Sequence, residues 1–150
     1  MTHLVLHHRM ASRLDELAGL ARAVSAWCVQ QGLPDTEAAR LNLMLDELVT
    51  NTVQHGYAGR ADGWVALRLG REGEVVHLDL SDGAPHFDPT AQPSSVQSAV
   101  DDEIETRPMG GLGVDFVRRL VLRWQHQALP AGNRLQLWRR IGSVPQGSRR

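Results

Sequence analysis

Three polar residues at four-residue spacing, Glu47, Asn51 and His55, carry side chains suited to chemistry. Spacing of four places side chains one above another on a helix surface. A carboxylate there can take up a proton, and an amide oxygen can bind Mg²⁺. The wet side of an ordinary amphipathic helix presents similar columns, so this spacing alone leaves a purely structural interpretation open.

The stretch 41–57 is predicted to be the helix that carries this column. Pro34 and Asp35 are expected to begin the helix, and Gly56 to end it. Its apolar side recurs every three or four residues and forms one buried stripe, made of Leu41, Met44, Leu45, Leu48, Val49, Thr52 and Val53. The column of polar residues therefore lies beside a face that packs on a core.

Alternating apolar and polar residues predict five strands, over 2–8, 64–69, 75–80, 122–128 and 134–138. Residues 71–73 join the middle pair as a hairpin, and a turn at 130–133 joins the last pair. Ser12 is predicted to cap a helix that ends at Gly32. Strands interleaved with helices predict an α/β fold.

Two further motifs gain meaning beside the first helix. Asp82-Gly83 follows a strand, where a carboxylate can accept a hydrogen bond from an exocyclic amine and glycine lets a ligand approach the backbone. The glycine-rich turn 110–113 leads into a helical pattern, and helix N-termini bind phosphate oxygens. Alone, the first motif is only a turn, and tight helix packing explains the second equally well.

Composition excludes several classes of protein. The chain has 150 residues, 42% hydrophobic and 22% charged, which suits one globular domain. A net charge of −1 provides no basic field for nucleic acid. All 16 basic residues are arginine, so the lysine of a P-loop or of an ordinary protein kinase is missing. The single cysteine, Cys28, is expected to be buried, and no apolar run is long enough to span a membrane.

The segments 46–57, 81–89 and 107–120, which read DELVTNTVQHGY, SDGAPHFDP and RPMGGLGVDFVRRL, resemble the three nucleotide-binding boxes of the GHKL ATPase/kinase superfamily. Their order and spacing match, and the resemblance covers roughly residues 10–140. The phrase from Asp82 to Pro89 is most similar to anti-sigma factor serine/threonine kinases of the RsbW and SpoIIAB type. Histidine kinases generally carry a second glycine where this chain has Pro85.

The resemblance implies a role for individual residues. Asn51 becomes the Mg²⁺ ligand, and Glu47 becomes the general base. Asp82 becomes the reader of adenine. The full set implied to contact ATP is Asn51, His55, Asp82, Gly83, Pro85, Arg107, Gly110, Gly111, Leu112 and Gly113. Met109 stands where some relatives have a basic residue, so Arg107 is the substitute for a phosphate-binding cation.

The resemblance also implies a fold and an organisation. The expected fold is an α/β two-layer sandwich, with a mixed, mostly antiparallel sheet and helices on one face. One domain is expected over 1–141, with an ATP lid at about 85–110. Residues 142–150 are expected to form a disordered tail.

For function, the resemblance implies an ATP- and Mg²⁺-dependent protein serine/threonine kinase. It would also be an anti-sigma factor of a partner-switching module in the cytoplasm. Its partners would be a STAS-domain anti-anti-sigma protein, a sigma factor and a second copy of the chain, with no nucleic acid or membrane. The alternative is a regulatory module that binds ATP and sequesters a protein without phosphorylating it. A third interpretation gives the three motifs no ligand.

Overall fold

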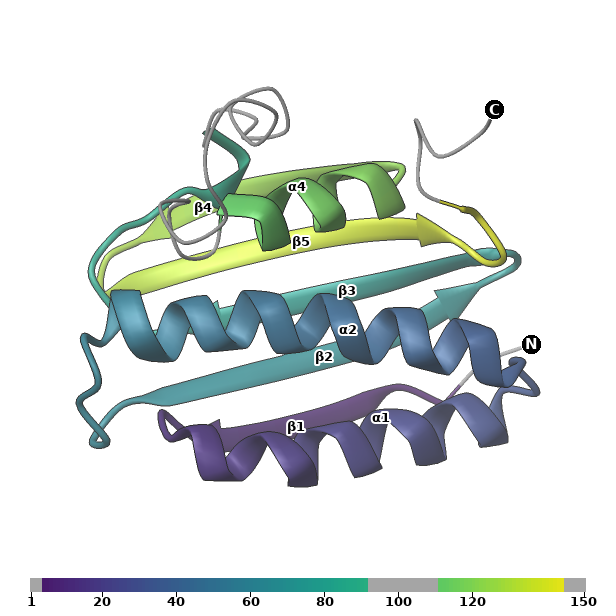
Figure 1. Ribbon diagram of the computed structural model, residues 1–150, viewed down its shortest axis with the longest axis horizontal. Coiled ribbons are helices and arrows are strands. Elements are labelled where there is room, and N and C mark those ends of the chain that lie inside the picture. Colours follow the sequence, from purple (N-terminus) through teal and green to yellow (C-terminus); the bar gives the residue numbers. More distant parts are fainter. Residues whose placement is uncertain (1–3, 92–110, 145–150) are drawn as a thin grey trace.

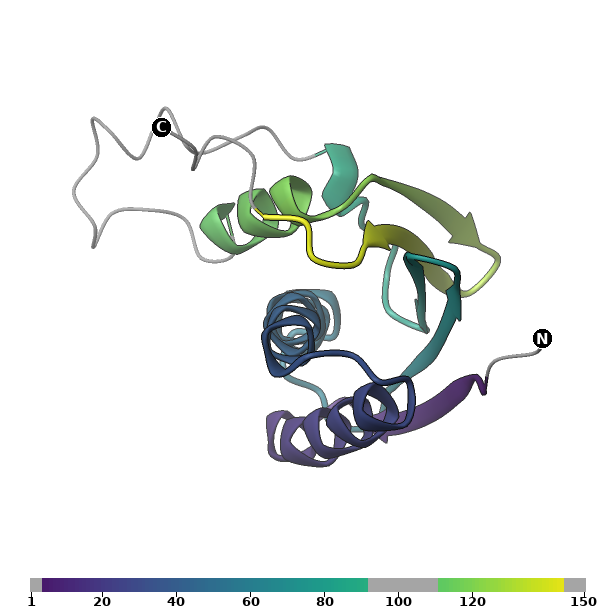
Figure 2. The same ribbon diagram turned by 90° about the vertical axis from the view of Figure 1, so that its right-hand side faces the viewer.

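The computed structural model describes residues 4–91 and 111–144, which form two layers (Figures 1 and 2). One layer is a five-stranded sheet in the order β1-β2-β3-β5-β4, and all of its pairings are antiparallel. The strands are β1 Leu6–Ala11, β2 Trp64–Glu72, β3 Val75–Asp82, β4 Arg123–Leu129 and β5 Gly132–Arg140. The expected two-layer α/β fold is confirmed, although the described sheet is antiparallel throughout and not mixed.

The second layer consists of helices that lie together on one face of the sheet (Figure 2). They are α1 Leu17–Gln30, α2 Asp35–Asn51 and α4 Gly111–Leu120. Short turns add η1 Leu14–Glu16, η2 Thr52–Gly56 and η3 Pro89–Ala91. Within the described ranges, no helix is both long and apolar enough to cross a bilayer.

The core lies between the sheet and the helices. Its side chains come from the stripe predicted on α2, from one face of α1 and from alternate positions of the strands. Those with no exposed surface include Val24, Leu41, Met44, Leu69, Val76, Leu78 and Leu137. Full burial of one such side chain contributes about 1.5–3 kcal/mol, so this stripe fixes which way α2 faces.

At its C-terminal end α2 leaves α-helical geometry. The α-helix ends at Asn51, and Thr52–Gly56 form a single π-helical turn. A π turn closes i→i+5 hydrogen bonds, so it rotates the following side chains away from the 3.6-residue column. Tyr57 follows with its amide bonded to Thr52 O at 2.8 Å.

Two expectations near the N-terminus are wrong. The first strand begins at Leu6 rather than at residue 2 and runs to Ala11, because its register places Met10 opposite Val65 over the core. Ser12 does not cap a helix. Its hydroxyl donates to Arg60 O at 2.6 Å and accepts from Gly63 N at 3.0 Å, which ties β1 to the turn before β2.

The end of the molecule near the start of α2 is closed by an ion pair. Glu37 and Arg139 both have fully buried side chains and make two hydrogen bonds, of 2.6 and 3.0 Å. Arg139 also donates to Leu120 O and Ser143 O, and Glu37 accepts from Gly142 N. Both charges of this ion pair, and most of the N–H donors of Arg139, therefore have partners inside the protein.

Candidate active site

A cleft opens at the other end of α2, where β3 ends and β5 begins. The space between its walls is about 520 Å³ when the adjoining open solvent is included. Its lining combines apolar side chains with a few polar groups: Leu48, Asn51, Thr52, Gly56, Leu80, Asp82, Ala84, Pro85, Phe87, Pro89, His126, Asn133 and Leu135. Three of the residues predicted to bind a cofactor, Asn51, Asp82 and Pro85, are thus brought together.

Asp82 ends β3 with one carboxylate oxygen engaged and the other available. Oδ1 accepts hydrogen bonds from Ala84 N and from Asn133 Nδ2, both at 2.9 Å. Oδ2 accepts no hydrogen bond from any residue in the described part of the chain. A carboxylate oxygen left open on a largely apolar cleft is an acceptor for a ligand donor such as an exocyclic amine.

Gly83 is held in place by the hydroxyl of Tyr57. This hydroxyl accepts from Gly83 N at 2.7 Å and donates to Trp64 O at 2.6 Å. A Cβ at Gly83 would meet Trp64 Nε1 at 2.9 Å, so only glycine fits there without displacement of the indole. Gly63 packs against the same tyrosine ring, where a Cβ would lie 2.2 Å from a ring carbon. The backbone beside Asp82 is therefore rigidly positioned.

Asn51 lines the cleft at the last residue of α2. Its side chain forms no hydrogen bond with another residue that the structure describes, so its amide oxygen is free to bind a ligand. No group of three or more His, Cys, Asp or Glu side chains gathers as a metal site within 4–91 and 111–144. The amide oxygen of Asn51 suits Mg²⁺, because this ion usually takes few protein oxygens and completes its coordination with phosphate and water.

Glu47 lies one turn before Asn51 and faces α4. A Cβ at Gly113 would lie 1.9 Å from Glu47 Oε1, so the glycine makes room for this carboxylate. Burial raises the pKa of Glu47 above its ordinary value of 4.5, and the negative charge of Asp46 adds to the rise. A half-buried carboxylate with a raised pKa beside a helix N-terminus has the properties of a general base.

The other predicted site residues have mixed positions. Gly111 and Leu112 belong to the first turn of α4, as the glycine-rich motif predicted. His55 is exposed and is not among the cleft residues, because the π turn removes it from the column of Glu47 and Asn51. Arg107, Gly110 and most of the expected lid lie outside the described residues, as does the end of the tail.

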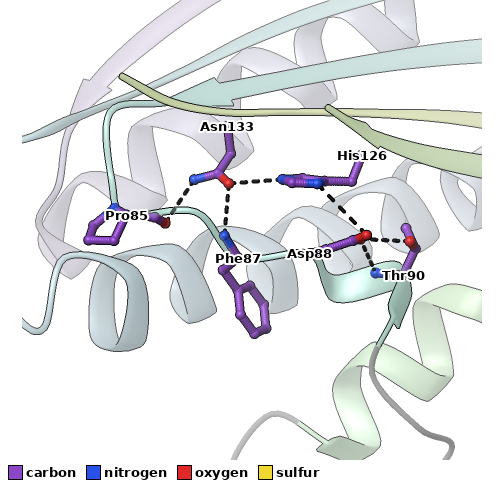
Figure 3. A network of polar contacts seen from close by, with 6 residues as sticks. All are labelled: Pro85, Phe87, Asp88, Thr90, His126 and Asn133. Atoms are coloured by element: carbon purple, nitrogen blue, oxygen red, sulfur yellow. Dashed lines mark hydrogen bonds and ion pairs between the residues drawn. The ribbon is translucent and has the colours of Figure 1, made fainter. Parts of the chain in front are cut away.

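Asn133 and His126 are polar cleft residues that were not predicted as site residues. Asn133 was expected in a turn, but it is the second residue of β5 and pairs directly with Asp82. His126 on β4 contacts Asn133 and faces Asp88 (Figure 3). No sequence signal marks them, because Pro-Ala-Gly-Asn resembles a turn and the histidine is one polar residue of an irregular strand.

An α/β sandwich whose cleft is lined by an open carboxylate and a free amide, with a helix N-terminus packed against Glu47 one turn from that amide, has the features of a nucleotide-binding domain. Residues 10–138 match the Histidine kinase-like ATPase domain family, so the chain belongs to that family. The family resemblance inferred from the three boxes is confirmed. ATP is the nucleotide that this family implies.

Known proteins that are similar to the chain include an anti-sigma factor and a two-domain crystal structure. An anti-sigma F factor from Geobacillus stearothermophilus is 33% identical over 90 residues, which are 57% of this chain and 62% of that protein. A crystal structure of the RsbU and RsbW domains of a Mycobacterium tuberculosis protein superposes with a TM-score of 0.59 and 19% identity. That match covers 92% of this chain and 32% of the other, and it supports the fold. The chain therefore aligns with less than two thirds of each relative.

Proposed function

We propose that the protein is an ATP-dependent protein serine/threonine kinase and an anti-sigma factor of a partner-switching module. It would phosphorylate a STAS-domain anti-anti-sigma protein and sequester a sigma factor. The observation that carries the proposal is the placement of Glu47 against Gly113, one turn from Asn51, which lines the same cleft as Asp82. The similarity to an anti-sigma F factor supports the choice of partners.

Each of these residues has a distinct task. Asp82 Oδ2 accepts a hydrogen bond from the exocyclic amine of adenine. The amide N–H groups of the first turn of α4, around Gly111–Gly113, bind phosphate oxygens together with the helix dipole. Asn51 supplies one oxygen ligand to Mg²⁺, which neutralises phosphate charge when bound. Glu47 takes the proton of the serine hydroxyl as the hydroxyl oxygen bonds to the γ-phosphorus of ATP and ADP leaves.

A single-turnover assay with labelled ATP, Mg²⁺ and the STAS partner tests the transfer step. Glu47→Gln keeps the size of the side chain and removes its basicity, so we expect phosphorylation slower by roughly 10²–10⁴-fold with nearly unchanged ATP affinity. The matched control is Asp46→Asn, which removes the neighbouring exposed carboxylate and should leave the rate at neutral pH nearly unchanged. Wild-type transfer by Glu47→Gln contradicts the general-base role.

Asn51→Ala separates metal binding from base catalysis. Loss of a Mg²⁺ ligand should weaken nucleotide binding itself, whereas Glu47→Gln should not. Calorimetric titration of ATP into both variants, with and without Mg²⁺, makes the comparison. Equal effects of the two substitutions on affinity would contradict the division of roles.

The second candidate is a module that binds ATP and sequesters a partner without phosphorylating it. The same assay decides between the two, because this candidate transfers no phosphoryl group to the STAS protein while its ATP affinity remains. As the resemblance implies, we further propose a cytoplasmic homodimer, and analytical ultracentrifugation of the purified chain tests its mass. A monomer at micromolar concentration contradicts the dimer.

A further inference from the structure

The side-chain amide of Asn133 has hydrogen-bond partners for both its nitrogen and its oxygen, and Figure 3 draws those to Pro85, Phe87 and His126. Nδ2 lies 2.9 Å from Asp82 Oδ1, 3.2 Å from Ala84 O and 3.1 Å from Pro85 O, which are all acceptors. Oδ1 lies 2.9 Å from Phe87 N, which is a donor. Only this orientation of the amide satisfies all four contacts, because the flipped amide would face three oxygens with its own oxygen.

The fixed amide also fixes a hydrogen on His126. His126 Nε2 lies 2.8 Å from Asn133 Oδ1, and an amide oxygen only accepts. Nε2 therefore carries a hydrogen and donates it. The other ring nitrogen, Nδ1, faces Asp88 Oδ2 at 3.8 Å, and the imidazole is 8% exposed. Oδ1 of Asn133 thus receives two donors, from Phe87 N and from the imidazole.

The orientation of Asn133 decides which oxygen of Asp82 faces a ligand. While Nδ2 donates to Asp82, Oδ1 of the carboxylate is held by two donors and Oδ2 remains open. A flipped amide would instead place an oxygen against Oδ1. The repulsion would turn the carboxylate and remove the open acceptor from its position at the cleft.

We propose that His126 is a positioning residue for adenine recognition: its Nε2–H adds a fifth contact that holds the Asn133 amide in this orientation, and the amide in turn aims Asp82 Oδ2 at the exocyclic amine. The proposal rests on the proposed function of Asp82 as the reader of adenine. His126 itself does not touch the base in this role. His126 in this role affects the preference of the protein for adenine over other bases, and it does not contribute to phosphate binding.

The experiment compares ATP with inosine triphosphate, in which a carbonyl oxygen replaces the exocyclic amine. Two substitutions of His126 differ in where they place a donor. In His126→Gln the amide nitrogen reaches the position of Nε2, whereas in His126→Asn the shorter side chain reaches only the position of Nδ1. Calorimetry gives both nucleotide affinities for each variant and for the wild-type protein, and thermal melting reports stability.

We expect His126→Asn to reduce the preference for ATP roughly three- to tenfold, as loss of one hydrogen bond allows. His126→Gln should keep the wild-type preference within about twofold. If both variants keep that preference, or if His126→Asn lowers both affinities equally, the role of His126 is refuted while adenine reading stands. A wild-type protein that binds the two nucleotides equally refutes adenine reading by Asp82 and the proposal with it.

A second measurement needs no nucleotide. The nitrogen chemical shifts of the imidazole in the ligand-free protein report which ring nitrogens carry hydrogen. We expect hydrogen on Nε2 of His126, and a pair of side-chain amide protons of Asn133 that exchange slowly with solvent. An imidazole with hydrogen on Nδ1 alone overturns the proposal, because Nε2 could then not donate to Asn133.

Discussion

The two ends of α2 hold carboxylates in opposite circumstances. Glu37, near its start, is fully buried against Arg139 and accepts hydrogen bonds on both oxygens. Asp82, beside the other end, receives only neutral donors, all on Oδ1. The difference lies in the partners, since both side chains face the inner side of the same sheet. A carboxylate neutralised inside the chain closes one end, and a carboxylate with an open oxygen makes a site at the other.

Loss of the cation at the closed end should have the largest effect. Arg139→Met leaves the buried Glu37 without its cation and with only the amide of Gly142 as a donor, and such losses typically cost about 3–5 kcal/mol of unfolding free energy. Urea denaturation measures it. The control is the double variant Glu37→Leu/Arg139→Met, which removes both charges and should recover most of the loss. A single variant as stable as the wild-type protein would show that Glu37 finds another partner or protonates at no cost.

The reverse pattern is expected at the open end. Asp82→Asn keeps Oδ1 and replaces Oδ2 by a donor, so ATP affinity should fall roughly 10- to 100-fold, with less than about 1 kcal/mol change in stability. The matched control is Asp79→Asn on the outer face of the same strand, where Asp79 pairs with Arg134 at 2.7 Å. Unchanged ATP affinity in Asp82→Asn would remove the distinction between the two ends.

Gly113→Ala tests how the open end positions its second carboxylate, that of Glu47. The added Cβ must displace Glu47 Oε1, so we expect transfer to slow roughly tenfold, below the 10²-fold that a full 1 Å misplacement can cost. Helix propensity should leave stability equal or slightly higher. The assay is single-turnover phosphorylation beside thermal melting. A normal rate would mean that the carboxylate can move without consequence.

The rate of phosphoryl transfer at the open end should depend on pH. The raised pKa of Glu47 implies that the transfer rate increases with pH through a midpoint above 4.5. Where pH is lower, the base is protonated and inactive. Single-turnover rates from pH 4 to 8 measure the midpoint, and Glu47→Gln should show no such rise. A wild-type midpoint at or below 4.5 contradicts the burial of this base.

Cys28 lies near Glu37, and ionisation of its thiol should have the smallest effect on stability at neutral pH. Burial, and secondarily the charge of Glu37, raises the pKa of the thiol from 9.0 to about 11. The folded state then holds a proton that the unfolded chain loses, so stability is unaffected below pH 9.0 and falls as pH rises from there toward 11. At pH 8 a thiol reagent should react rapidly only in denaturant. Rapid reaction of the folded protein would contradict burial.

The sequence alone was sufficient to predict those parts of the fold and the site that depend on local spacing of residues. The stripe on α2, the position of Asp82 after a strand and the glycines that begin α4 follow from periodicity and helix-terminus rules. Asn133 could not be predicted, because its role depends on the β3–β5 pairing with Asp82, a residue 51 positions away. The π turn after Asn51 was equally hidden, since apolar spacing continues through it and only the folded backbone shows that His55 has rotated outward.

The hydroxyl of Tyr57, bonded to both Gly83 and Trp64, has a spectroscopic consequence. Tyr57 is the sole tyrosine of the chain. Its hydroxyl contacts Gly83, which follows Asp82, the residue whose carboxylate we assign to adenine. Incorporation of fluorotyrosine during expression would therefore introduce a single fluorine resonance at this point. Its chemical shift would report the arrival of a nucleotide without any radiolabel, enzyme-coupled assay or partner protein.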